Sequence, residues 1–352
     1  MSRCPSLGPT PIDSETFVYR ETRRERGLHG SAVTELGERT MKLAMIDNFR
    51  PAIITADGAV DVSDAVPEIM AVPPAYRMAE LIERWAQHLP TVKEVSANSL
   101  AKPLSTVRLR APVPRPAKLL CAQLSFREGL QATKISPTFF LKSSTCVIGP
   151  GDTIELNPVD AKVFHHEAEL ALIVGKRAKA IAPHDALAHV FGYTCFLDIS
   201  ARGIGHGTSF QDKSYDTFGP MGPWIATADE IPDPHALDVR LWTDGELRHD
   251  YPMSDLAKSI PEMIAYASSI AALEPGDVLS LGVNHQGLGP IQDGELLKIE
   301  IAPIGAFEVR VSDSRKRRWK SGIDRGAAAW VKGLVAGDGT IGHPQFAERL
   351  DS

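Results

Sequence analysis

Two glutamates lie two residues apart in an aliphatic segment of the chain. Glu167 and Glu169 occur in FHHEAELALIVG, residues 164–175, a pattern typical of a buried β-strand. Because alternate residues of a strand point to the same face, the two carboxylates would project together. Like charges that close are unfavourable unless a cation lies between them. The pattern therefore favours a metal site, and the alternative is a surface ladder paired with Lys or Arg.

A third carboxylate lies downstream. Asp198 ends the apolar run of FGYTCFLDISARG, residues 191–203. Two Glu and one Asp offer hard oxygen ligands, which suit Mg²⁺ or Mn²⁺ better than Zn²⁺. His165 and His166 precede the glutamates, but adjacent strand residues face opposite sides, so at most one of them could reach the same ion. We expect structural or supporting roles for both histidines.

Composition narrows the class of protein. The 352 residues are 43% hydrophobic and 23% charged, which is ordinary for a soluble globular protein of one or two domains. A formal net charge of −6 and the lack of a basic aromatic motif argue against a nucleic-acid partner. No apolar stretch is long enough to cross a membrane, and no secretory signal is evident. The four cysteines lack metal-type spacing, so a cytoplasmic location is expected.

The first third of the chain divides into segments of different composition and residue pattern. Residues 1–40 are polar and charge-dense, and we interpret them as an N-terminal extension. Residues 41–105 predict a small α+β domain, with a hairpin at Asp57-Gly58 and a helix over 76–88. The Pro-rich sequence RAPVPRPAK at 110–118 favours extended chain, and we place a linker at 106–116.

The remainder is rich in predicted strands. Residues 117–315 are expected to form the catalytic domain, with helices over roughly 184–191 and 253–272. The second helix predicts a buried stripe that includes Ile260, Ile264, Ala265 and Ile270. The absence of a GxGxxG motif, a P-loop and a βαβ rhythm argues against a doubly wound nucleotide-binding fold. Residues 316–352 are interpreted as a C-terminal tail, and the basic run RKRRWK at 315–320 as a solvated segment.

Four segments, in order, resemble the fumarylacetoacetate hydrolase family: HHEAELALIVGKRAKAI, VFGYTCFLDISARG, DKSYDTFGPMGPWIATADEIPDP and LEPGDVLSLGVNHQGLGPIQDGE. The resemblance runs from about Lys118 to Val311. It implies an α+β, mostly β fold, in which a mixed β-roll catalytic domain follows a small N-terminal domain. It also implies a homodimer, a catalytic Mg²⁺ or Mn²⁺, and hydrolysis, decarboxylation, hydration or tautomerisation of 2-oxo acids.

The resemblance also assigns residues. The metal triad of the family matches the three carboxylates that residue chemistry selects. Its SAR arginine matches Arg202, the lysine of its GKSFD motif matches Lys213 in DKSYD, and the lysine of its FLK motif matches Lys142. These cations would hold a substrate carboxylate and developing enolate charge. The alternatives are a salt bridge for Arg202, a solvated loop position for Lys213 and a structural ion pair for Lys142.

The departures from the family pattern are equally informative. Hydrolytic relatives carry a His and a Glu, three residues apart, that activate water. Gly129 and Ala132 occupy these positions here and supply no base. Glu128 is the nearest ionisable substitute, so we predict it as the general base, with His206 and His285 as the next candidates.

A second departure concerns the substrate turn. The family's GTP turn, whose threonine contacts substrate, reads Gly282-Val283-Asn284 here, and SARD has become SARG at Gly203. A branch of the family with an acidic residue before the missing His also has an NHxGL turn. The chain resembles this branch through Glu128 and the sequence 284–288. We therefore expect Asn284 and His285 to contact the substrate.

Two functions from different classes follow. The first is a divalent-metal enzyme acting on a small 2-oxo acid or β-diketo acid, with a small carboxylate as its partner. Without the His–Glu dyad, decarboxylation, tautomerisation or hydration gain weight over C–C bond hydrolysis. The alternative is a catalytically inactive, metal-retaining binding or assembly protein. Retention of three ligands and the basic residues argues against this alternative, because a scaffold gains nothing from a costly carboxylate cluster.

Overall fold

The computed structural model describes residues 41–134, 136, 138–205, 208–338 and 342–350. The predicted extension, residues 1–40, and the candidate base His206 therefore lie outside the described residues. The fold is mostly β with several helices, which confirms the predicted α+β class. In the described part of the chain, no helix is both long enough and apolar enough to cross a bilayer.

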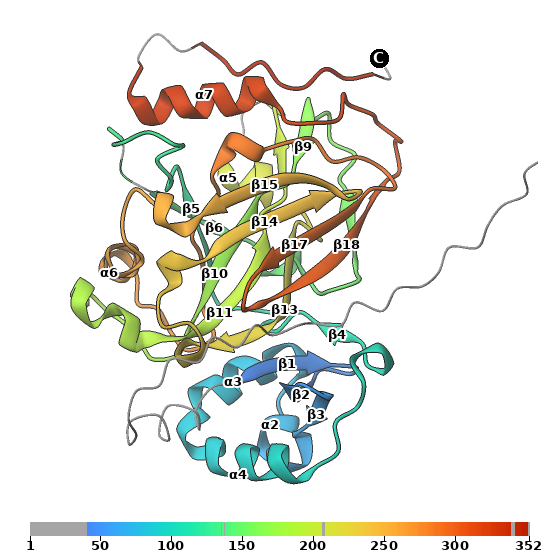
Figure 1. Ribbon diagram of the computed structural model, residues 1–352, viewed down its shortest axis with the longest axis vertical. Helices are drawn as coiled ribbons and strands as arrows, with labels where there is room; N and C mark the ends of the chain where they lie inside the picture. The colour runs from blue at the N-terminus through green and yellow to red at the C-terminus, as the bar shows by residue number, and fades with distance from the viewer. Residues whose placement is uncertain (1–40, 135, 137, 206–207, 339–341, 351–352) are drawn as a thin grey trace, which may run out of the picture. The chain divides into compact units, whose positions relative to one another are not determined.

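One large mixed sheet forms the centre of the fold (Figure 1). Its main path, in spatial order, runs through β3 (Gly58–Asp61), β2 (Arg50–Thr55), β1 (Lys42–Ile46), β13 (Gly219–Thr227), β11 (Val190–Leu197), β10 (Ala168–Val174), β16 (Val278–Ser280), β5 (Leu119–Gln123) and β6 (Thr138–Lys142). Two short strands join it from the side: β4 (Leu109–Arg110) pairs with β1, and β7 (Val147–Ile148) with β13. Most neighbours are antiparallel, but β16 and β5 run parallel.

A second sheet packs on the first. Its order is β15 (Glu246–Pro252), β14 (Asp238–Thr243), β17 (Leu296–Ile301), β18 (Gly305–Asp313) and β8 (Thr153–Leu156). Strands β14 and β17 contact β10 and β11 of the large sheet (Figure 1). A separate pair, β9 (Val163–His165) with β12 (Ser200–Arg202), continues beyond the ends of β10 and β11. This packing covers β10 with protein, and all seven of its residues are buried.

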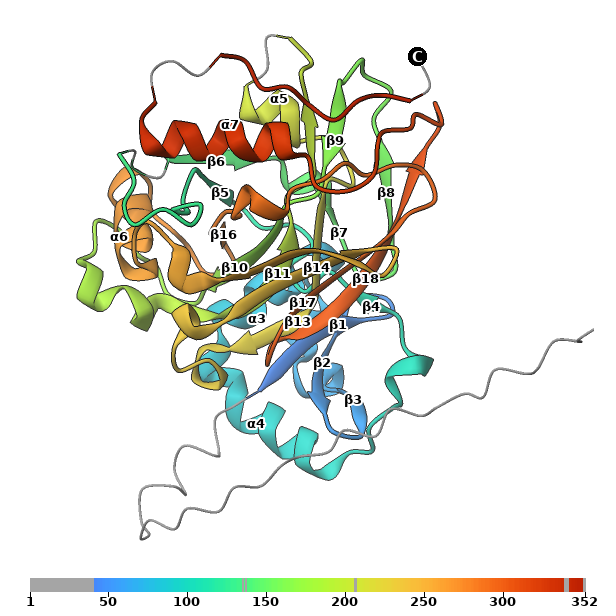
Figure 2. The same cartoon turned by 45° about the horizontal axis from the view of Figure 1, so that its top comes forward.

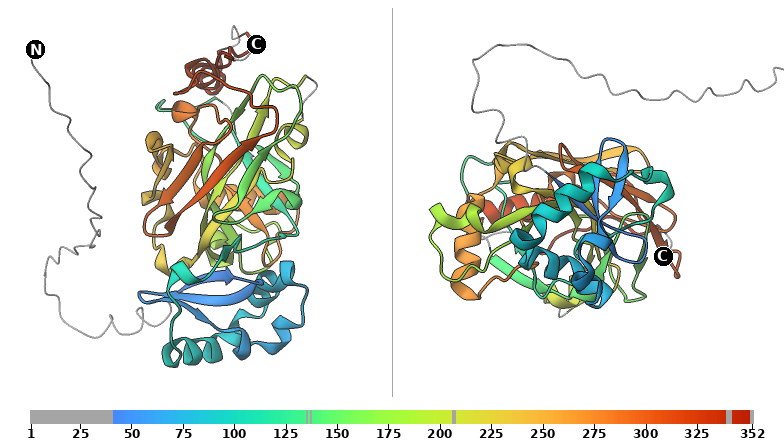
Figure 3. Two further views of the ribbon diagram at one scale, coloured as in Figure 1. Left: turned by 90° about the vertical axis from the view of Figure 1, so that its right-hand side faces the viewer. Right: turned by 90° about the horizontal axis from the view of Figure 1, so that it is seen from below.

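The α-helices are short and lie outside the sheets. They are α2 (Pro67–Met70), α3 (Arg77–Glu83), α4 (Trp85–Asn98), α5 (Ser209–Lys213), α6 (Ile260–Ile270) and α7 (Arg325–Ala336). Helices α3 and α4 lie beside β1–β3 and share its apolar core (Figure 3). A Ser259 capping box begins α6, in which Ser259 and Glu262 satisfy each other's backbone N–H groups.

Several predicted elements are confirmed and others need correction. The hairpin at Asp57-Gly58 is present, with Thr55 opposite Gly58 in the β2–β3 pair. The helix predicted over 76–88 is two helices, α3 and α4, interrupted at Arg84.

The two helices predicted in the second part of the chain are shorter than expected. The first is a 3₁₀ helix, Pro183–His189, because Val190 already pairs in β11. The second is α6, Ile260–Ile270, in which Ile260, Ile264 and Ala265 are buried as predicted but Ile270, its last residue, is 64% exposed.

The Pro-rich segment is packed rather than exposed. Pro112 and Pro114 are buried, and Leu109 pairs with Ile46 across β4 and β1. Strand β1 in turn pairs with β13 of the large sheet. The boundaries at 41–105, 106–116 and 117–315 stay a prediction, because they concern independent folding rather than contact.

The basic run at 315–320 is not a solvated segment. Arg317 and Trp319 are buried, and Arg317 donates to both oxygens of Asp313 at 2.8 and 2.9 Å and to the carbonyl of Val159 at 2.7 Å. Its guanidinium also lies 4.7 Å from the ring centre of Phe164. Exposed residues alternate with these two, so the basic composition of the run does not reveal that Arg317 and Trp319 are buried.

We expect the replacement of Arg317 by Met to lower the free energy of unfolding by about 3–5 kcal/mol, because it leaves the Asp313 carboxylate buried without its partner. The matched control is Lys320→Met, which removes an exposed charge from the same run and should change stability by less than about 0.5 kcal/mol. Denaturant unfolding followed by circular dichroism measures both. Equal effects of the two variants would contradict the buried anchor.

Candidate metal centre and its cavity

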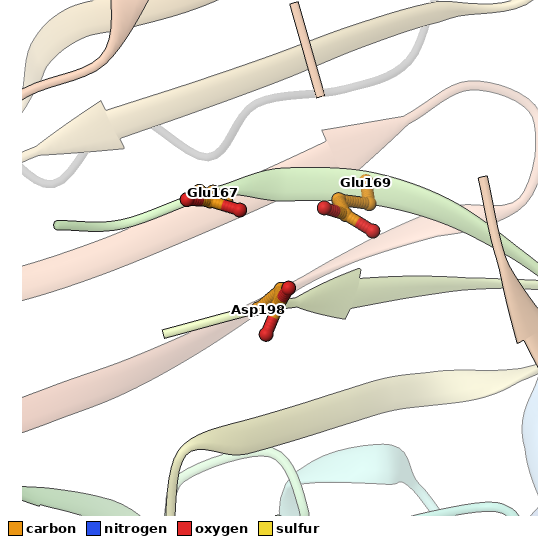
Figure 4. Close-up of side chains that lie close together, drawn as sticks. All are labelled: Glu167, Glu169 and Asp198. Atoms are coloured by element: carbon orange, nitrogen blue, oxygen red, sulfur yellow. The ribbon is translucent and has the colours of Figure 1, made fainter. Parts of the chain in front are cut away.

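Strand pairing brings the three predicted carboxylates together. Glu167 precedes β10, Glu169 is its second residue, and Asp198 follows β11. The Asp198 N–H donates to the Glu167 carbonyl at 2.9 Å, which fixes the ends of the two strands. Figure 4 shows the three carboxylates facing a common space, and one oxygen from each lies within 4.8 Å of the others.

Cationic side chains hold two of these carboxylates. Lys213 donates to Glu167 at 2.6 Å and to Asp198 at 2.7 Å, while Arg202 also donates to Glu167. Lys142 is fully buried and donates to Asp198 at 2.5 Å. Burial would raise the pKa of Glu167, but the charges of Lys213 and Arg202 hold that pKa well below its usual value.

Glu169 has no such cation bonded to its Oε1 in the described part of the chain. Its Oε2 accepts from the Ser280 hydroxyl and from the Gly282 N–H, whereas its Oε1 is buried and has no partner among the described residues. Burial, followed by the charges of Asp198 and Glu167, raises the pKa of Glu169 well above its ordinary value. A buried carboxylate oxygen that lacks a donor and faces two further carboxylates fits a hard divalent cation.

The balance of local charges also indicates the charge of a ligand that would bind beside the ion. With all three carboxylates ionised, Lys142, Lys213 and Arg202 balance them. A divalent cation then adds two positive charges to a buried centre. An anionic ligand would offset this surplus, because uncompensated charge in a low-dielectric site is costly.

A cavity of about 290 Å³ opens next to the centre. Four of the lining residues, Glu167, Arg202, Asp212 and Lys213, carry ionisable acidic or basic side chains. Most of the other lining residues are apolar and include Leu124, Val283, Leu288, Ala327, Trp330, Val331, Leu334, Pro344 and Phe346. The volume is at the low end of typical ligand pockets, so the site fits a small molecule.

A histidine–glutamate pair lies on the cavity wall. Glu128 is fully buried, and its Oε1 lies 2.7 Å from Nδ1 of His285, which lines the cavity. Glu128 also accepts from the His285 N–H at 2.9 Å and from the Gln286 amide at 2.8 Å. The carboxylate favours the proton on Nδ1, which leaves Nε2 as the accepting nitrogen of the ring.

The backbone near this pair is strained. Glu128 has a φ of 56° and Leu124 a φ of 54°, in the left-handed region that non-glycine residues rarely occupy. Each such residue costs about 1–3 kcal/mol and persists only when its surroundings fix it. Here the hydrogen bonds of Glu128 to the 285–286 backbone and side chains provide that constraint.

The other predicted site residues divide into two groups. Arg202, Lys213 and His285 line the cavity, as expected for substrate contacts. Lys142 is instead bonded to Asp198 behind the centre, and Asn284 directs its amide to Asp255 at 2.8 Å. The structure thus gives Lys142 and Asn284 supporting positions, and their direct contact with substrate stays a prediction.

The first histidine of the HH pair has a structural partner. His165 bonds to Asp324 at 3.0 Å, and the acidic triad includes neither His165 nor His166. Gly203, the departure from SARD, has a φ of 70°, and a Cβ there would meet the Lys162 side chain at 2.7 Å. Glycine therefore suits this position better than aspartate.

Sequence reasoning missed two parts of the site. Asp212 lines the cavity, its Oδ1 has no partner among the described residues, and burial raises its pKa. Its place beside the predicted Lys213 was the available signal. Helix α7 supplies part of the apolar wall although its residues lie in the segment interpreted as a tail. Its spacing of alanine, tryptophan, valine and leucine could have indicated an amphipathic helix.

We expect Glu169→Gln to stabilise the metal-free protein and to remove the stability gain that Mg²⁺ confers. The variant removes a buried charge but also a metal ligand. The parent should gain about 2.7 kcal/mol at a Mg²⁺ concentration one hundred times the dissociation constant. Thermal unfolding with Mg²⁺ and with chelator measures both effects, and Glu155→Gln, at an exposed position, is the control. A parent-sized Mg²⁺ gain in Glu169→Gln would refute the ligand assignment.

The pH dependence of the parent follows from the same carboxyl. Its raised folded-state pKa means that Glu169 favours folding while protonated, below the unfolded value of 4.5, and that this contribution is lost as pH rises through the folded pKa. The chelated parent should therefore lose stability with rising pH, and Glu169→Gln should lose less. Metal affinity should increase as pH rises above the ordinary carboxyl value of 4.5, because the ion competes with the proton.

Comparisons with known proteins identify the family of the chain. The sequence model described as fumarylacetoacetate (FAA) hydrolase C-terminal matches residues 118–312. A maleylpyruvate hydrolase of Aquipseudomonas alcaligenes is 29% identical over 292 residues, or 77% of this chain and 99% of the relative. An oxaloacetate tautomerase of Bacillus subtilis is 35% identical over 223 residues, or 59% of this chain and 74% of the relative.

Solved structures give the same result. The crystal structure of maleylpyruvate hydrolase from Sphingobium sp. SYK-6 is 35% identical, with a TM-score of 0.71, and the match covers 78% of this chain and all of that one. A second structure of that hydrolase, in complex with manganese(II) and pyruvate, has a TM-score of 0.69. Named relatives are thus hydrolases and tautomerases of oxo acids, and this chain belongs to the fumarylacetoacetate hydrolase family.

Proposed function

We propose that this enzyme forms the enolate of a small 2-oxo acid and interconverts its keto and enol forms. One observation carries the proposal: His285, with Nδ1 held by Glu128, lines the same cavity as Arg202 and Lys213. A base and cations that line one cavity meet the two requirements for removing a proton next to a carbonyl.

The metal would be Mg²⁺ or Mn²⁺, held by Glu167, Glu169 and Asp198. When bound, such a cation supplies Lewis-acid polarisation of the 2-oxo carbonyl. The manganese and pyruvate in the Sphingobium structure support a divalent cation together with a small 2-oxo acid. Lys142 would act through Asp198, which it orients, and is therefore a positioning residue.

Arg202 and Lys213 would hold the acid end of the substrate. A guanidinium carries five donors, so Arg202 can bind a carboxylate while it keeps its bond to Glu167. Lys213 lies between Glu167 and Asp198, where its ammonium faces the charge that develops on the enolate oxygen. Both cations are already in place, so no side-chain reorganisation is needed as charge develops.

His285 would carry the proton. Its Nε2 takes a proton from the carbon beside the 2-oxo group, and the electron pair of that C–H bond moves onto the oxygen. Glu128 stabilises the imidazolium that forms, so Glu128 is a positioning residue rather than the base. Return of the proton to the enolate oxygen gives the enol, with no net change in atoms or electrons.

A second candidate is C–C bond hydrolysis of a β-diketo acid. The chain covers the full length of the Sphingobium maleylpyruvate hydrolase, and the His285–Glu128 pair supplies a base that Gly129 and Ala132 lack. His285 would deprotonate a water that adds to the distal carbonyl, and the broken C–C bond would leave its electron pair in a pyruvate enolate. Tautomerisation ranks first because it needs no placed water.

We expect His285→Asn to lower kcat for oxaloacetate tautomerisation by about 10²–10⁴-fold, the range of general-base catalysis. Glu128→Gln should lower it at least about tenfold, while the KM and the Mg²⁺-linked stability gain remain unchanged. The control is His184→Asn, at a histidine whose side chain is 81% exposed. Enol and keto absorbance, with Mg²⁺ and with chelator, follows the reaction.

Three outcomes would overturn parts of this proposal. Full activity of His285→Asn would move the base elsewhere, with Glu128 and His206 the remaining predicted candidates. If the parent cleaves an acylpyruvate faster than it tautomerises oxaloacetate, the hydrolase hypothesis would be favoured. Lack of any metal-dependent turnover would restore the inactive binding or assembly protein as the better account.

We also propose a homodimer and a cytoplasmic location. The dimer rests on the family, and the location on the absence of a disulfide at Cys121, Cys146 and Cys195, which are buried thiols. Light scattering at micromolar concentration should return twice the 38.2 kDa chain mass. A monomer mass would contradict the dimer.

A further inference from the structure

Helix α7 forms one wall of the cavity. Ala327, Trp330, Val331 and Leu334 all line it, at positions i, i+3, i+4 and i+7 of the helix. This spacing places the four side chains on one stripe. Phe346 from the following segment continues the same wall. The helix lies at the same end of the protein as α5 and β9 (Figure 2), and it is outside the residues that the family model matches.

Asp324 fixes the start of this wall. Its Oδ1 accepts from the Ala327 N–H at 3.0 Å and so caps α7. Its Oδ2 bonds to His165 at 3.0 Å and accepts from the Ala347 N–H at 2.8 Å. One buried carboxylate therefore joins the helix, the segment that carries Phe346 and strand β9, which leads to the metal centre.

Two further contacts hold the body of the helix. The Lys134 N–H donates to the Val335 carbonyl at 2.9 Å, and the Gln286 amide donates to the Ala328 carbonyl at 3.4 Å. Gln286 also bonds to Glu128, the partner of His285. The wall is thus attached to the proposed base as well as to the metal side, which suits a surface that positions a substrate.

The wall carries no charge toward the cavity. Among the described lining residues, Arg202 and Lys213 are the permanent cations, and both are bonded to carboxylates of the metal centre. The remaining charged lining residues, Glu167 and Asp212, are acidic. A second carboxylate placed against α7 would lose hydration without gaining a partner. An apolar group there would gain about 25 cal/mol for each Å² that it buries.

We infer that α7 and Phe346 select the substrate, and that the substrate is a 2-oxo acid with an apolar aromatic or branched substituent rather than a second carboxylate. This inference rests on the proposed function, since it assigns the 2-oxo acid end to the metal side. Such a substrate differs from those in the names of the chain's relatives, because oxaloacetate and maleylpyruvate are both dicarboxylic acids.

Steady-state tautomerisation of phenylpyruvate and oxaloacetate with Mg²⁺ tests the selection. The parent should have the higher kcat/KM for phenylpyruvate. Trp330→Ala should lower that value by about 10–200-fold, the range for a lost apolar contact, and lower the oxaloacetate value by a smaller factor. Val331→Lys should shift the preference toward oxaloacetate. Ala329→Lys, which adds the same charge at an exposed position of α7, should not.

Binding of two probes that cannot enolise separates this inference from the proposed function. Benzoylformate carries an apolar group and oxomalonate a second carboxylate, and calorimetry with Mg²⁺ measures both dissociation constants. Tighter binding of benzoylformate that Trp330→Ala weakens supports the wall even if no tautomerisation occurs. Tighter binding of oxomalonate, or equal loss of both probes in Trp330→Ala, overturns it even if the enzyme is an active tautomerase. Failure of both probes to bind with Mg²⁺ present overturns both proposals.

Discussion

The site depends on a cluster of like charges that the fold keeps buried. Glu167, Glu169 and Asp198 converge at the ends of β10 and β11, where each has at most 3% of its surface exposed. Cations from three elements meet them: Lys142 ends β6, Arg202 ends β12 and Lys213 ends α5. Such a cluster is stable only when every charge is compensated. Glu169, with one oxygen unpaired, is the position where the protein chain alone does not complete that compensation.

The proposed base shows how the same chemistry can arise from different segments. The positions that carry His and Glu in hydrolytic relatives are Gly129 and Ala132 here, yet a Glu–His pair faces the cavity. It joins the 128 turn to the 285 turn, 157 residues apart in the chain. The left-handed conformation of Glu128 is the local cost of this arrangement, and its hydrogen bonds to the 285–286 turn offset that cost.

The C-terminal segment is part of the site because buried polar contacts attach it. Arg317 anchors it through Asp313 and stacks on Phe164, in the strand that leads toward the triad. Asp324 then caps α7 and bonds to His165 of the same strand. These contacts satisfy charged groups that would otherwise be buried alone, so the segment is held at defined points. The wall that faces the substrate is a consequence of that attachment.

The sequence determined the elements and ligands whose signals are local. The i, i+2 spacing of Glu167 and Glu169 in an apolar run predicted a metal pair, and the Asp57-Gly58 hairpin followed from turn chemistry. The end of the next apolar run indicated Asp198 as a third ligand, and the motifs of the family added the cations around the triad.

Only the tertiary structure decided what lies opposite these residues. It paired Glu128 with His285, bonded Lys142 to Asp198, and placed residues of α7 in the cavity wall. In each case the deciding contact joins residues far apart in the chain. Periodicity and spacing report the face on which a side chain lies, but not which distant side chain packs against it, because that choice depends on the packing of the whole core.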